Sequence, residues 1–68
     1  MDEEAFQQSI RKFLRTVGVR SQQEIEKAVA QARADGRIGD DDAFPAKMTL
    51  VVAGLQLNVT FDGEIRLA

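Results

Sequence analysis

The chain has 68 residues, of which 44% are hydrophobic and 29% charged, and its formal net charge is −2. This length allows one small domain, the apolar fraction excludes a disordered chain, and no apolar stretch reaches the roughly 20 residues of a membrane span. Cysteine and histidine are absent, so disulfides, thiolate metal sites and the usual general base are excluded. Because the acidic N-terminus is also unlike a secretory signal, we expect one cytoplasmic domain over residues 1–68.

The first third of the chain has the pattern of an amphipathic helix. Acidic residues 2–4 would favour the start of the helix dipole, basic side chains follow at residues 11–15, and Gly18 suits a C-terminal cap. The spacing predicts a helix over about residues 3–17. Its apolar face would comprise Phe6, Ile10, Phe13, Leu14 and Val17.

A second helix is predicted to begin at Ser21. The segment Ser21-Gln22-Gln23-Glu24 has the form of a capping box, in which side chains and backbone amides of the first and fourth residues pair. A thin apolar stripe follows, and Gly36 is expected to close the helix. The stripe consists of Ile25, Ala28, Val29 and Ala32.

Residues 37–46 have the composition of a loop, with three consecutive aspartates at positions 40–42. Oxygen ligands of this kind bind divalent cations, but a calcium-binding loop alternates its acidic residues and ends in a bidentate glutamate. This loop matches neither feature. We therefore expect a solvated turn and no metal site.

The last third of the chain alternates between apolar and polar residues with the period of a β-strand. A two-residue turn at Ala53-Gly54 would set Val52 opposite Leu55 and keep the apolar side chains on one face. For the next turn two registers compete. A bulged turn over Phe61-Asp62-Gly63 keeps Ile65 and Leu67 on that face, whereas a plain two-residue turn does not.

These elements predict an α+β fold of the order ααβββ. Two N-terminal helices would pack on one face of a three-stranded antiparallel β-meander, and the other face would be solvated. The strand from Met48 to Val52 would then be an edge, and Phe61 would lie at a hairpin tip.

No arrangement of residues indicates catalysis. Without histidine, no group is available to activate a serine, and Ser21 already has a capping role. The five glycines fall at caps, turns and loops and form no phosphate-binding fingerprint. We expect a protein that is not an enzyme and has no cofactor.

Two binding roles are consistent with the sequence, and the preferred one is protein interaction. Exposed apolar residues in the loops and on the solvated sheet face would form the contact, and the free edge would allow a weak homodimer. A fold in which the second helix or the 37–46 loop covers that edge would instead give a monomer. The candidate interface residues are Thr49, Val51, Phe44 and Phe61.

The alternative is a small nucleic-acid-binding regulator. Residues 11–33 hold six basic and two acidic side chains, a local balance of +4, in a helix-turn-helix-like arrangement. The acidic chain as a whole, with a pI of about 4.9, argues against this role. The candidate contacts would be Arg20, Gln22, Gln23, Lys27 and Gln31.

Taken in order along the chain, several segments resemble a family of short bacterial proteins of unknown function. The similar segments are residues 5–14, Val17-Gly18-Val19, residues 21–29, Pro45 to Leu50 and residues 62–65. The resemblance covers nearly the whole chain. It implies no activity, because none is assigned to that family.

Overall fold

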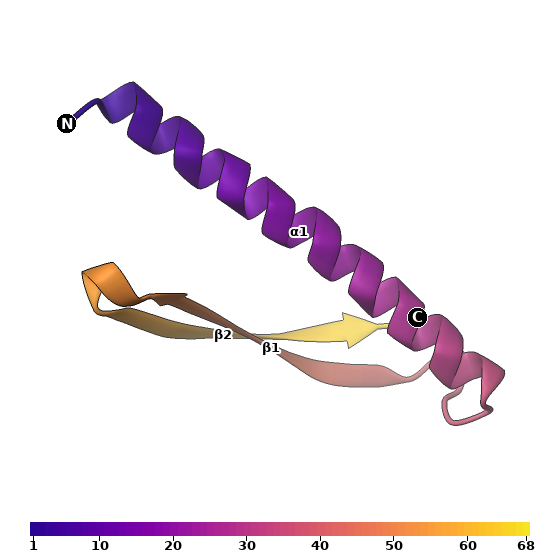
Figure 1. Ribbon diagram of the computed structural model, residues 1–68. Helices are drawn as coiled ribbons and strands as arrows, with labels where there is room; N and C mark the ends of the chain where they lie inside the picture. Colours follow the sequence, from indigo (N-terminus) through magenta and orange to yellow (C-terminus); the bar gives the residue numbers. More distant parts are fainter. The chain divides into compact units, whose positions relative to one another are not determined.

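The computed structural model describes all residues from 1 to 68. The chain divides into two compact units, Met1–Arg37 and Ile38–Ala68. The first contains the helix α1 and the second contains an antiparallel hairpin of β1 and β2 (Figure 1). The fold is therefore α+β, but the predicted ααβββ arrangement of two helices and a three-stranded meander is wrong. Helix α1 contains no stretch with the length and apolar character of a membrane span.

Helix α1 runs without interruption over Glu3–Ala34. The predicted break at Gly18 and the predicted new helix at Ser21 do not occur. A break would leave about four amides and four carbonyls without helical partners at the two new ends, whereas a glycine inside a helix costs only about 1 kcal/mol relative to alanine. The apolar residues Val17 and Ile25 also stay in helical phase across the junction, with the small Ser21 between them, so nothing in the pattern requires a turn.

Both ends of α1 are capped by its own residues. At the start, an Asp2 carboxylate oxygen accepts a hydrogen bond from the Ala5 amide at 3.0 Å. At the end, Gly36 adopts the left-handed conformation with φ of 70°, as the sequence predicted. The Arg37 amide then donates to the Ala32 carbonyl at 2.9 Å, and the Gly36 amide to the Arg33 carbonyl at 3.0 Å. This is a Schellman motif, which satisfies carbonyls that the last turn would otherwise leave open.

The second unit is a two-stranded hairpin of β1 (Ala43–Val52) and β2 (Leu57–Arg66). The predicted two-residue turn is wrong, because residues 53–56 all belong to the connection. A short 3-10 turn, η1, covers Ala53–Leu55, and Gln56 follows with a left-handed φ of 53°. Val52 therefore pairs with Leu57 and not with Leu55. This shift of two residues leaves the side chains of residues 48–52 and 57–60 on their predicted faces, whereas Leu55 lies in the turn.

The predicted bulged turn at Phe61-Asp62-Gly63 is also wrong. These residues lie inside β2, where Gly63 is the partner of Ala46 and Phe61 is the partner of Met48. The ladder extends past the strand ends through a 3.0 Å bond from the Leu67 amide to the Asp42 carbonyl. The third strand does not exist, so no strand has two neighbours and both β1 and β2 are edge strands.

Candidate protein-interaction surface

One face of the hairpin is entirely apolar apart from a glycine. Alternation along the two strands brings five cross-strand pairs to this face, which we call the hairpin face. The pairs are Phe44 with Ile65, Ala46 with Gly63, Met48 with Phe61, Leu50 with Val59, and Val52 with Leu57. None of these side chains is buried, and Phe61 is 56% exposed. The hairpin thus presents an apolar surface that it cannot cover by itself.

The opposite face of the hairpin is mainly polar. The Thr49 and Thr60 hydroxyls lie 3.3 Å apart across the strands, and Lys47 is the partner of Asp62. Ala43, Pro45 and Val51 are the exceptions, and Val51 is 58% exposed with the polar Asn58 as its cross-strand partner.

The four residues predicted for a protein interface are therefore divided between the two faces. Phe44 and Phe61 belong to the hairpin face, whereas Thr49 and Val51 lie on the polar face. A single partner on one side of the hairpin would contact two of them and not four. Met48 was not predicted as the partner of Phe61. The alternation of apolar and polar residues from Leu57 to Ile65, with Gly63 at one apolar position, nevertheless indicates a strand that continues through Phe61.

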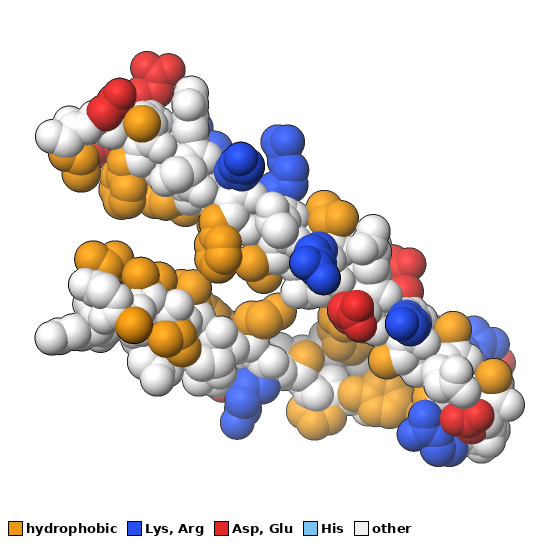
Figure 2. Space-filling view, in the orientation of Figure 1, with side chains coloured by type: hydrophobic (Ala, Val, Ile, Leu, Met, Phe, Trp, Pro, Cys, Tyr) orange, Lys and Arg blue, Asp and Glu red, His pale blue; other side chains and the backbone are white.

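Helix α1 presents a second apolar surface, which we call the helix stripe. Figure 2 shows orange side chains gathered along one side of α1 and basic side chains over other parts of its visible surface. Phe6, Phe13 and Leu14 are 45%, 52% and 55% exposed. Toward the C-terminal end the stripe contains Ala32, the one buried residue of the chain. The stripe positions are Phe6, Ile10, Phe13, Val17, Ser21, Ile25, Ala28 and Ala32, with Leu14 and Val29 beside them.

The five candidate nucleic-acid contacts are all exposed on α1, but they do not form one group. Arg20, Gln23, Lys27 and Gln31 follow one another at spacings of three and four residues, so they form one row on the helix. Gln22 lies outside this row and donates to a Glu26 carboxylate oxygen at 2.9 Å. The helix-turn-helix itself is absent, because α1 continues through residues 18–21.

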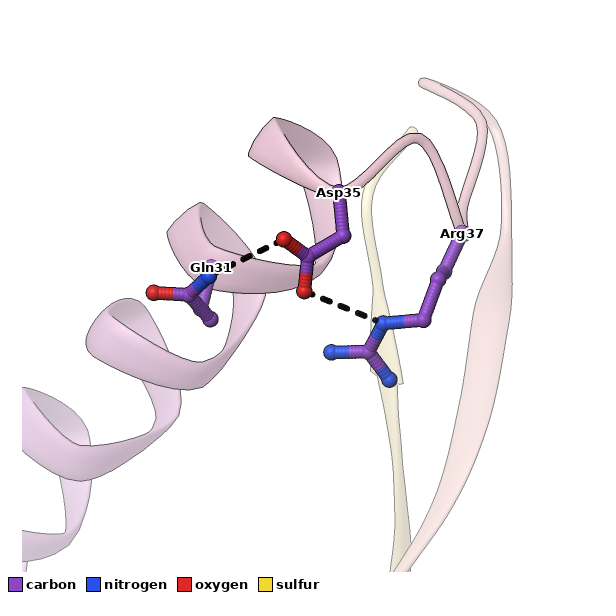
Figure 3. A network of polar contacts seen from close by, with 3 residues as sticks. All are labelled: Gln31, Asp35 and Arg37. Carbon is purple, nitrogen blue, oxygen red and sulfur yellow. Dashed lines mark hydrogen bonds and ion pairs between the residues drawn. The ribbon is translucent and has the colours of Figure 1, made fainter.

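A polar network lies at the C-terminal end of α1 (Figure 3). The Gln31 side-chain amide donates to one Asp35 carboxylate oxygen at 3.1 Å, and the Arg37 Nε lies 3.4 Å from the other. The Arg37 and Asp35 side chains are 64% and 45% exposed, so solvent screens this ion pair and it adds little stability. The network is local to the end of α1 and defines no binding site.

The aspartate run at residues 40–42 shapes the loop before β1. An Asp42 carboxylate oxygen accepts a hydrogen bond from the Gly39 amide at 2.9 Å, closing a local turn. No three acidic side chains of the chain come together in a group that could hold a metal ion.

The chain belongs to the Family of unknown function (DUF6494), which it matches over residues 1–68. This confirms the resemblance to a family without an assigned activity. No curated protein and no solved structure matches the chain significantly.

Proposed function

We propose that this protein is a non-enzymatic interaction module whose apolar surfaces are completed by another polypeptide. The observation that carries the proposal is that Ala32 is the one buried residue, while twelve large hydrophobic side chains are exposed. Exposed apolar area on this scale in a small protein is typical of a binding surface. Since the sequence contains neither histidine nor cysteine, the proposal assigns it binding and no catalysis.

The stability of the two units supports the same role. An isolated hairpin of two strands is marginally stable in water, and helices gain most of their stability from packing of the apolar face. A core in a chain of this size rarely supplies more than about 3–5 kcal/mol without a staple, and this chain has no cysteine for one. Binding that covers the hairpin face or the helix stripe would add stability by mass action.

The proposal is tested by measuring thermal unfolding of the purified full chain over a wide range of protein concentrations, together with affinity capture from native lysate. We expect one of two results. Either the midpoint temperature of unfolding rises with the concentration of the chain, or a foreign protein is captured. Phe61→Asp should abolish capture through the hairpin face, whereas Thr60→Asp, on the polar face, should preserve it. A monomer with a concentration-independent, cooperative transition and no Phe61-dependent capture would contradict the proposal.

Binding of nucleic acid is the alternative function, and the row of Arg20, Gln23, Lys27 and Gln31 is the feature that favours it. Without a helix-turn-helix, contact would depend on this row meeting phosphates and bases along one side of α1. Binding to mixed DNA and RNA should then weaken steeply with salt, and Lys27→Ala should reduce the salt slope by about one unit. No measurable binding at low salt would remove this alternative.

The cytoplasm is the compartment that we propose for the module. Fractionation of cells that express the full chain tests this assignment.

A further inference from the structure

The positions of the helix stripe are symmetric about the middle of α1. The successive spacings of residues 6, 10, 13, 17, 21, 25, 28 and 32 are 4, 3, 4, 4, 4, 3 and 4, which read the same in both directions. We infer that the partner of the helix stripe is the same stripe of a second copy, antiparallel, with a two-fold axis at position 19. This inference rests on the proposed function and names the partner.

The side chains that would then face each other are complementary in size. An antiparallel copy brings together positions whose numbers add to 38, so every stripe position meets a stripe position. In three of the four kinds of pair, a larger residue from the N-terminal half meets a small one from the C-terminal half, which lets the layers interdigitate. The pairs are Phe6 with Ala32, Ile10 with Ala28, Phe13 with Ile25, and Val17 with Ser21. A parallel pair would set Phe6 against Phe6 and Ala32 against Ala32, with crowding at one end and voids at the other.

Charge also favours the antiparallel direction. In a parallel pair the acidic residues 2–4 would lie beside their own copies, and so would Arg11, Lys12 and Arg15. The antiparallel pair places Lys12 at the level of Glu26 of the second copy and Arg11 at the level of Lys27, with Glu24 and Glu26 within three residues of it. It also brings residues 2–4 to the helix end that carries Arg33 and Arg37, and it opposes the two helix dipoles.

The middle of α1 has the small residues that such a crossing needs. A Cβ built on Gly18 would meet no atom within 4 Å, so nothing within the chain requires a glycine there. Glycine destabilises a helix interior, but it lets a neighbouring helix approach closely. Ser21 is a stripe position two residues from the proposed axis, and Gly18 lies at the edge of the stripe, one residue from the axis. The stripe also repeats every eleven residues, as in 6, 17 and 28, which predicts a slight right-handed twist of the pair.

Exchanging the residues of one pair tests the inference. Positions 10 and 28 are about 27 Å apart along one helix, so they compensate for each other only across a dimer. By sedimentation equilibrium we expect Ile10→Ala and Ala28→Ile each to raise the dimer dissociation constant at least tenfold. The double variant should return within about threefold of the wild type. The control exchange, Val19→Ala with Ala30→Ile on the opposite side of α1, should leave the dissociation constant unchanged.

Disulfide cross-linking tests whether the two helices run antiparallel, and it changes only one residue in each copy. Because the chain has no cysteine, Ile10→Cys and Ala28→Cys can be made singly and mixed before oxidation. We expect a disulfide between the two variants in the mixture and none within either variant alone. A disulfide formed by Ile10→Cys alone would show a parallel pair and overturn the inference.

Two further outcomes separate this inference from the proposed function. A dimer that is insensitive to the stripe exchanges and lost on Phe61→Asp would overturn the antiparallel helix pair, and the interaction role would stand. A monomer at all concentrations that still captures a foreign protein through a Phe61-dependent contact would do the same. A monomer that captures nothing would contradict both.

Discussion

Phe61 lies directly across the hairpin from Met48, at the middle of the two strands. Their side chains are 56% and 45% exposed, so this pair forms the largest uncovered part of the hairpin face. Directly opposed side chains are the unit by which a sheet is stabilised. In a protein of two edge strands, the same pair therefore contributes to the fold and offers an apolar surface to a partner.

Phe61→Ala should lower the free energy of unfolding by about 0.5–1 kcal/mol at low protein concentration, because it removes one cross-strand pair that is already half exposed. Urea denaturation followed by far-ultraviolet circular dichroism measures this effect. Asn58→Ala, on the polar face, should change the free energy by less than about 0.5 kcal/mol. Equal losses in the two variants would mean that the facing of β2 is wrong.

The hairpin connection contains a residue in an unfavourable conformation. Gln56 has a φ of 53°, a region in which side chains other than glycine are strained. Gln56→Gly should therefore raise the free energy of unfolding by about 0.5–1 kcal/mol. The greater conformational entropy of glycine in the unfolded chain offsets part of this gain. The matched variant is Gly36→Ala, where φ is 70°, and it should lower the stability by a similar amount. Thermal unfolding measures whether each variant is more or less stable than the wild type. A loss of stability in Gln56→Gly would contradict the left-handed conformation of residue 56.

The sequence predicted the facing of the strands better than their pairing. Alternation from Met48 to Val52 and from Leu57 to Val59 placed the apolar residues on one face, and the structure agrees. The pairing failed because a shift of two residues preserves the facing, so the pattern cannot select between the registers. At Asp62-Gly63 a strong turn dipeptide outweighed an alternation that continued through Phe61 to Ile65. As a consequence, Phe61 was placed at a hairpin tip when it lies in the middle of a strand.

In the helix, the outer ends were predictable and the middle was not. Gly36 ended α1 as expected, since a left-handed residue is required there. Gly18 and the Ser21–Glu24 segment carry equally good local signals for a stop and a start. Those signals lose because a continuous helix already pairs the amides and carbonyls that a break would expose. Because of this error the exposed helix stripe was not predicted, since a pair of packed helices would have buried part of it.

Gly18→Ala should stabilise α1 when the chain is monomeric. Alanine in place of glycine inside a helix contributes about 0.5–1 kcal/mol, and the new methyl group has open space within the chain. Urea denaturation at a low protein concentration measures the gain. A loss of stability under these conditions would indicate that residue 18 is not in a continuous helix.

The last prediction distinguishes the true start of α1 from the apparent one. The Asp2 carboxylate accepts from the Ala5 amide at 3.0 Å and adds negative charge at the positive end of the helix dipole. Asp2→Ala should therefore cost about 0.5–2 kcal/mol, the usual effect of losing an N-terminal cap. Ser21 lies in the helix interior, where alanine has the higher helix propensity, so Ser21→Ala should be neutral or slightly stabilising in the monomer. Circular dichroism during urea titration measures both variants. If Ser21→Ala proved as costly as Asp2→Ala, a helix would begin at Ser21 and α1 would not be a single helix.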